Sequence, residues 1–278
     1  MSLRESLRKF PWIHKPISLF FQCFIYPVCN GYYLFMIKYL LTIRKNEIKA
    51  LRTYDFINVK PFKTRVWRNG SEKDCAYRRY YLADYHDSKC FIKVAQNDST
   101  ISNEIFVAEQ LQGKEPTFIS KIITFDRFFT GSKQMLATGF VNGLHPISKE
   151  SVYNNVESVS ANKLVKYCKQ MLEILGSLET LQLVHADIHK GNLMLDANDN
   201  LVLLDFGISK FLNKENDVQY RFRPGTFFRE KNGLRIYDDA FSFVKLINRY
   251  ESCKNIIDDD AYKAICARIN KVTFSVKI

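Results

Sequence analysis

Five polar residues near the middle of the sequence have the types and spacing that acid–base or metal-assisted chemistry needs. His185 and His189 flank Asp187 at two residues on either side, Asn192 lies five residues after Asp187, and Asp205 lies thirteen residues after Asn192. Carboxylate and amide oxygens are the ligands that hard divalent cations prefer, and a positioned carboxylate can also accept a proton. These residues are therefore the first candidates for a functional site.

A helix and two short strands must position these residues. Apolar residues recur at intervals of three and four from Leu164 to Leu178, which predicts an amphipathic helix just before the polar loop. The runs Leu193–Leu195 and Leu201–Leu204 predict two strands joined by a polar turn. Asp205 follows the second strand directly, so a hairpin would return it to the loop.

The rest of the chain predicts a β-rich half followed by an α-rich half, with the join near residues 139–143. Turn residues separate apolar runs in the first half, and helical spacing dominates the second. The expected elements are strands within 54–94, a helix over 101–111, strands at 118–125 and 134–141, and helices from Tyr237 onward. We therefore expect an α+β, two-lobed layout.

The loop His185-Ala-Asp-Ile-His-Lys-Gly-Asn192, followed by Asp205-Phe-Gly207, resembles the catalytic loop and metal-binding motif of the protein-kinase-like fold. The resemblance implies that Asp187 orients an acceptor hydroxyl and accepts its proton. It also implies that Asn192 and Asp205 bind Mg²⁺ on the phosphates of ATP. His189, in the same loop, is a further candidate catalytic residue.

Upstream positions extend the resemblance to the nucleotide site. Lys93 resembles the strand lysine that holds the α- and β-phosphates. Glu104 is its expected partner on the following helix, and Glu109 is the alternative. The backbone of Phe140 and Val141 resembles the hinge that binds adenine.

Two other positions match the family to different extents. Asp239 resembles the aspartate that ties down the catalytic loop. The glycine-rich phosphate loop has no clear counterpart, because Gly70 is the one glycine between the first two expected strands. We expect Gly70 to contribute to the nucleotide cover. The missing glycines also leave open a non-enzymatic pseudokinase scaffold.

Three departures from ordinary protein kinases bear on the acceptor. His189 stands where serine/threonine protein kinases usually carry lysine, 39 residues follow Asp239, and an Ala-Pro-Glu motif is absent. The best overall resemblance is to the lipopolysaccharide core sugar kinases, particularly the heptose kinases. It implies a sugar or glycolipid acceptor. A serine/threonine or atypical protein kinase with a trimmed C-lobe, and a small-alcohol kinase, remain alternatives.

Charge distribution suggests where such an enzyme would act. The 278-residue chain has a net charge of +12, and its first hundred residues hold 18 Lys and Arg against 8 Asp and Glu. The uncharged run 17–37 is interrupted by Pro27 and Gly31, and basic residues flank both its sides. We expect interfacial helices on an anionic membrane; packing on the main domain and a true span are the alternatives.

Composition narrows the class further. The seven cysteines include no Cys-x-x-Cys pair, which argues against a disulfide framework or a zinc module and favours a reducing compartment. We expect a cytoplasmic protein at the cytoplasmic face of the inner membrane, without a nucleic-acid partner. The predicted organisation is a basic, apolar, helical extension (1–50), a β-rich N-lobe (51–141) and a shortened, α-rich C-lobe (142–278).

Overall fold

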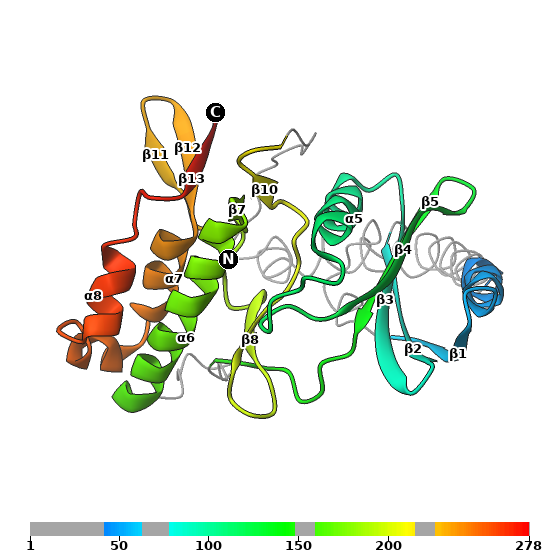
Figure 1. Cartoon of the computed structure of the whole chain (residues 1–278), viewed down its shortest axis with the longest axis horizontal. Helices are drawn as coiled ribbons and strands as arrows, with labels where there is room; N and C mark the ends of the chain where they lie inside the picture. Colours follow the sequence, from blue (N-terminus) through cyan, green and yellow to red (C-terminus); the bar gives the residue numbers. More distant parts are fainter. Residues whose placement is uncertain (1–41, 63–77, 148–158, 215–225, 278) are drawn as a thin grey trace, which may run out of the picture. The chain divides into compact units, whose positions relative to one another are not determined.

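The computed structural model describes residues 42–62, 78–147, 159–214 and 226–277 (Figure 1). The chain divides into two compact units, 1–54 and 55–278. In the first unit, residues 42–52 form a helix. The run 17–37 lies outside the described residues, so its membrane association stays a prediction. Among the residues that are described, no helix has the length and apolar character needed to cross a membrane.

The second unit contains a five-stranded antiparallel sheet in the order β1-β2-β3-β5-β4. A tight turn at His86 and Asp87 joins β2 to β3, and Tyr80 is paired with Lys93 across them. The helix α5 packs on β4 and β5. Its first turn is capped by Asp98, whose side chain accepts the Thr100 N–H. The bounds are β1 Phe56–Pro61, β2 Arg78–Tyr85, β3 Ser88–Gln96, α5 Ser99–Leu111, β4 Ile122–Thr130 and β5 Lys133–Gly139.

After β5 in the sequence, helices α6, α7 and α8 pack against one another (Figure 1). The predicted amphipathic helix is α6, and its apolar stripe from Leu164 to Leu178 is buried in the core. Short strands alternate with these helices along the chain. The bounds are β6 His145–Pro146, α6 Ala161–Thr180, β7 Leu183–Val184, β8 Leu193–Leu195, β9 Leu201–Leu203, β10 Lys210–Phe211, β11 Arg229–Lys231, β12 Leu234–Asp238, α7 Asp239–Ile247, the 3₁₀ helix η3 Glu251–Asn255, α8 Asp260–Cys266 and β13 Thr273–Lys277.

Two of the expected elements differ in the structure. The strand expected at 118–125 begins only at Ile122, because Phe118 lies in a turn and its carbonyl accepts the Leu203 N–H of β9. The C-terminal half is also less uniformly helical than expected from Tyr237 onward. Residues Thr273–Lys277 form β13, which pairs with β12 and completes a three-stranded sheet with β11.

Candidate active site

A cavity of about 600 Å³ lies between the five-stranded sheet and the loops around β8 and β9. That volume is in the range of small-ligand sites. Several predicted nucleotide or metal residues line it: Lys93, Glu104, Phe140, Val141, Asn192 and Asp205. Asp187 is not part of the lining, and Gly70 lies outside the described residues. The structure therefore brings six of the predicted residues to one cavity.

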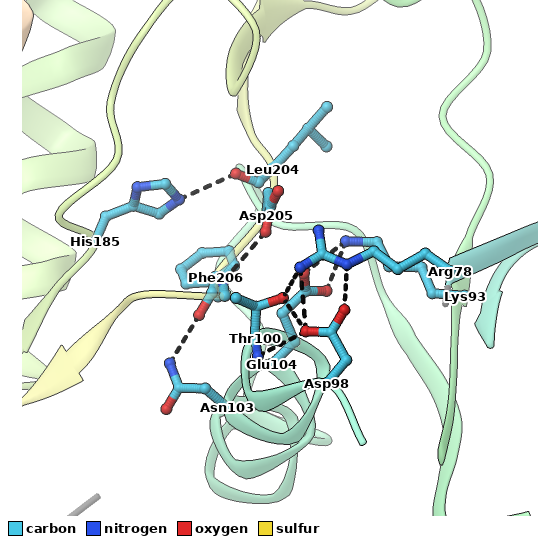
Figure 2. Close-up of polar contacts among 11 residues, drawn as sticks. Arg78, Lys93, Asp98, Thr100, Asn103, Glu104, His185, Leu204, Asp205 and Phe206 are labelled. Carbon is cyan, nitrogen blue, oxygen red and sulfur yellow. Dashed lines mark hydrogen bonds and ion pairs between the residues drawn. The ribbon is translucent and has the colours of Figure 1, made fainter. Parts of the chain in front are cut away.

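Lys93 and Glu104 form a buried ion pair at one end of the cavity (Figure 2). The Lys93 Nζ donates to both oxygens of Glu104, at 2.8 and 2.6 Å. The side chain of Lys93 is 17% exposed and that of Glu104 is 6% exposed. Glu109, the alternative partner, instead pairs with Arg127 of β4 at 2.8 Å. The geometry therefore selects Glu104.

Asp205 makes this pair part of a three-group cluster. Burial lowers the pKa of Lys93, but attraction to Glu104 and Asp205 outweighs burial and raises it. Burial raises the pKa of Glu104 to about 8, against the lowering effect of Lys93 and with a further rise from Asp205. Two acidic groups thus compete for one ammonium group, and an additional cation beside them would favour their ionised forms.

Asn192 and Asp205 have donor atoms suited to Mg²⁺. The Asn192 Nδ2 donates to both the carbonyl and the Oδ2 of Asp187, each at 3.1 Å. This turns the Asn192 Oδ1 away from Asp187, and within the described segments no hydrogen bond reaches it. One carboxylate and one amide oxygen, completed by nucleotide phosphates, match the preference of Mg²⁺ for few protein ligands. Within the described residues, no three His, Cys, Asp or Glu side chains cluster in a way that could hold a metal ion.

Asp239 holds the catalytic loop by its backbone. Its Oδ2 accepts the His185 N–H at 2.7 Å and its Oδ1 accepts the Ala186 N–H at 2.9 Å. Ala186 has φ = 68°, a left-handed conformation that a residue with a Cβ rarely adopts. The two bonds stabilise this strained backbone immediately before Asp187. Asp239 therefore has the structural position that the resemblance implies.

Replacing Asp239 by asparagine should destabilise the fold in a pH-dependent way. The single amide oxygen can accept only one of the two backbone N–H groups. The other N–H would face the amide NH₂, which is also a donor, and such a buried donor without an acceptor costs about 1–3 kcal/mol. Burial raises the pKa of Asp239 to about 7, so between pH 4 and pH 7 the folded state binds a proton that the unfolded state has lost. This contribution to the free energy of unfolding falls as pH rises through 7.

Urea unfolding at several pH values checks this prediction. In the wild-type protein, the contribution of Asp239 protonation to the free energy of unfolding is lost as pH rises. Asp239→Asn has no group that titrates at this position. The difference in the free energy of unfolding between the two proteins should therefore narrow from pH 5 to pH 8. A gap that stays constant from pH 5 to pH 8 would contradict the prediction, because it would mean that Asp239 is ionised in both the folded and the unfolded protein throughout this range.

His185 links the catalytic loop to the segment at Asp205. Its Nδ1 accepts the Asp187 N–H at 3.2 Å and its Nε2 lies 3.0 Å from the Leu204 carbonyl. These contacts fit a neutral ring with the proton on Nε2, and burial lowers the pKa of His185 to about 4. The ring also packs edge-on against Phe206, with centroids 4.8 Å apart. His185 is thus a positioning residue.

Two side chains contact the Asp187 carboxylate on its outer side. The Thr226 hydroxyl donates to Oδ1 at 2.6 Å, and the His189 Nε2 lies 3.6 Å from the same oxygen. The His189 Nδ1 accepts the Gly191 N–H at 2.9 Å, which orients the ring. An aliphatic hydroxyl therefore fits against Asp187, and His189 lies beside it.

Aromatic residues form the sheet side of the cavity, which the sequence analysis missed. Phe62, Tyr80 and Phe91 all line it. Tyr80 and Phe91 stack with centroids 5.6 Å apart at 16°, and Phe62 meets Phe91 edge-on at 5.5 Å. The alternation of residues along β2 and β3 could have indicated which of them share a face of the sheet. It could not indicate which face borders the cavity, because that depends on the strand register. Such a surface suits the face of a planar base.

Asn103 was also missed. It precedes Glu104 on α5, is buried, and its Nδ2 donates to the Phe206 carbonyl at 3.0 Å and to the Ser209 carbonyl at 2.9 Å (Figure 2). Through these bonds α5 fixes the backbone that follows Asp205. No sequence signal marks this role, since the partners lie about a hundred residues away.

Together, a lysine–glutamate pair on a sheet and its helix, a catalytic loop with a candidate base, and a metal-ligand pair define the site of a phosphotransferase. In agreement, residues 85–228 match the protein kinase domain family. The match covers just over half of the chain, and the chain therefore belongs to the protein kinase family. Members of this family transfer a phosphoryl group from Mg·ATP to a hydroxyl group.

Curated relatives carry kinase names as well. The chain is 23% identical over 176 residues to serine/threonine-protein kinase 10-A of Xenopus laevis, covering 61% of this chain and 18% of that protein. It is 39% identical over 59 residues to mitogen-activated protein kinase kinase 9 of Arabidopsis thaliana, covering 21% of this chain and 19% of that one. The matches thus span less than a fifth of each relative.

Proposed function

We propose that the protein transfers the γ-phosphate of Mg·ATP to an aliphatic hydroxyl, with serine or threonine of a protein as the leading acceptor. The observation that carries this proposal is the Thr226 hydroxyl, which donates to Asp187 Oδ1 at 2.6 Å. This contact supports the proposal, because the oxygen that would accept the proton of the acceptor is the one that the threonine hydroxyl contacts. The serine/threonine kinase names of the relatives favour the same acceptor.

Each residue has a defined task in this reaction. The aromatic surface of Phe62, Tyr80 and Phe91 packs against the adenine base of ATP. Lys93 contacts phosphate oxygens, and Glu104 holds Lys93 in place. Asp187 orients the acceptor hydroxyl and takes its proton. Mg²⁺ held by Asn192 and Asp205 would neutralise charge on the phosphates. Because phosphoryl transfer needs little covalent participation from the protein, positioned charge supplies most of the catalysis.

A sugar hydroxyl of an envelope glycolipid is the second candidate acceptor. His189 favours it, because this residue replaces the usual lysine of protein kinases and its ring lies 3.6 Å from Asp187. The relatives support a protein acceptor better than lipopolysaccharide, so the resemblance to heptose kinases ranks second. Location at the inner face of a membrane remains a proposal that follows from the basic, apolar N-terminal sequence alone.

Labelled ATP offered with separate acceptors tests the proposal. A generic serine- and threonine-rich protein, lipopolysaccharide and a set of small alcohols would be incubated in parallel with the full chain and Mg²⁺. We expect label on serine or threonine of the protein acceptor. Label found on lipopolysaccharide alone would select the second candidate, and intact ATP in every reaction would contradict both.

A further inference from the structure

Arg78 places a second cation on the cavity side of the sheet. It is the first residue of β2 and is paired with Ala95 of β3, whereas Tyr80, two residues later, is paired with Lys93. Residues two apart on a strand share one face of the sheet. Tyr80 lines the cavity, so Arg78, which is not itself a lining residue, lies on the same face at the rim, one step beyond Lys93 along the strands.

The helix α5 holds the Arg78 guanidinium in a fixed position (Figure 2). Its Nε and Nη2 donate to the carboxylate of Asp98, with the Nη2 to Oδ1 bond at 3.1 Å, and Nη2 also donates to the Thr100 hydroxyl. Lys93 is held in the same way by Glu104, four residues after Thr100. The anchoring residues Thr100 and Glu104 are therefore about one helical turn apart, roughly 6 Å along α5.

Part of the Arg78 fork remains available to a ligand. A guanidinium carries five N–H donors, and the bonds to Asp98 and Thr100 use Nε and Nη2. Within the described residues no hydrogen bond engages Nη1, and the Arg78 side chain is 26% exposed. Burial lowers the pKa of Arg78, but its bond to Asp98 and the charges of Asp98, Tyr80 and Asp205 outweigh burial and raise it, which fits a position near the carboxylate proposed to bind Mg²⁺.

This arrangement fits the phosphate chain of a nucleotide. Lys93 contributes one positive charge, and Arg78, anchored about a helical turn earlier on α5, adds a second with a planar fork that matches phosphate oxygens. The sequence between β1 and β2 has a single glycine, Gly70, and so lacks the repeated glycines of a glycine-rich phosphate loop. A side-chain donor on β2, such as Arg78, would supply a phosphate contact that the missing glycine-rich loop would otherwise make.

We propose that Arg78 is a phosphate-binding residue, whose Nη1 donates to the β- or γ-phosphate of the bound nucleotide while Asp98 and Thr100 hold the guanidinium. This assignment rests on the proposed function, because it requires ATP in the cavity. It gives β2 a task in substrate binding that its sequence motif does not indicate.

Calorimetric binding of ATP, ADP and adenosine to the full chain tests the assignment. Arg78→Gln can still donate a hydrogen bond to Asp98 but lacks the charge and the fork. Its affinity for ATP and ADP should fall about 10- to 100-fold, the loss of one or two charge-assisted bonds, while adenosine affinity stays unchanged. Arg127→Gln is the matched control, because it removes another strand-to-α5 ion pair, to Glu109, away from the cavity.

Asp98→Asn separates phosphate binding from a role in fixing α5. Asparagine still caps the helix, so this variant removes the charged partner of Arg78 and keeps α5 in place. ATP affinity should be retained or increased, because Arg78 is then less neutralised. An equal loss in Asp98→Asn and Arg78→Gln would make Arg78 a structural clamp and overturn the assignment.

The binding data also distinguish this assignment from the proposed function. If Arg78→Gln kept wild-type affinity for ATP, or lost as much affinity for adenosine as for ATP, the assignment of Arg78 would be overturned and the proposed function would stand. A wild-type protein that binds no ATP would overturn the proposed function and the assignment together.

Discussion

Replacing Asp187 by asparagine should reduce phosphoryl transfer about 10²- to 10⁴-fold and leave ATP affinity nearly unchanged. The amide has almost the same shape, but it cannot take the proton of the acceptor hydroxyl. Asp187 does not line the nucleotide cavity, so the binding site for ATP should persist. Steady-state kinetics with the best acceptor, together with calorimetric ATP binding, measure the two effects separately.

Asp196→Asn is a matched control for this variant. Asp196 lies in the turn between β8 and β9, where its Oδ1 accepts the Asn198 and Asn200 N–H groups, both at 2.8 Å. An asparagine oxygen can accept the same bonds, so activity should stay near the wild-type value. If Asp187→Asn kept wild-type turnover, Asp187 would be a structural residue of the loop. An unfolded variant, detected by circular dichroism, would point to the same conclusion.

Lys93→Met should have the second largest effect, and it should act on both nucleotide affinity and turnover. Methionine keeps much of the side-chain volume but leaves the carboxylates of Glu104 and Asp205 facing each other and the phosphates. We expect ATP affinity to fall about 10- to 100-fold and kcat/KM to fall about 10²- to 10³-fold, since a charge-assisted contact to the phosphates is lost. Calorimetry and kinetics check the two values.

Two further variants sharpen this prediction. Lys89→Met makes the same substitution on the same strand at an exposed position, and it should leave binding intact. Glu104→Gln retains an acceptor for Lys93 without the charge, so its loss of kcat/KM should be smaller than that of Lys93→Met. Equal losses in Lys89→Met and Lys93→Met would show that Lys93 has no specific contact with the nucleotide.

The catalytic loop could be predicted from sequence because its residues are close together in the chain. Asp187, Asn192 and Asp205 are separated by fixed distances, and the hairpin of β8 and β9 between them has a clear apolar pattern. Lys93 and Glu104 were identified from their places on a strand and the next helix. The structure joins them by direct bonds.

Residues whose roles depend on strand register or on distant contacts were not predictable in this way. Arg78 acquires its position from pairing with Ala95, and Asn103 acquires its position from carbonyls at Phe206 and Ser209. The strand expected at 118–125 was placed too early because apolar residues such as Phe118 also occur in buried turns. Local patterns carry no information on such tertiary contacts.

The C-terminal sheet shows the same limit for the fold. Thr273–Lys277 alternates and contains β-branched residues, yet it becomes a strand through its partner β12, which precedes α7. The helical spacing from Tyr237 onward favoured helices in this part of the chain instead. The α-rich half therefore contains more sheet than the sequence pattern indicated.

The most direct test of the central claim is the loss of the γ-phosphate from labelled ATP in wild-type protein and Asp187→Asn, with Mg²⁺ and with a chelator. Labelled acceptor and inorganic phosphate would be counted together, so that transfer to any hydroxyl, including water, is detected. We expect Mg²⁺-dependent loss of the γ-phosphate in the wild type and almost none in Asp187→Asn. Intact ATP in the wild-type reaction, or equal loss in both proteins, would contradict the central claim.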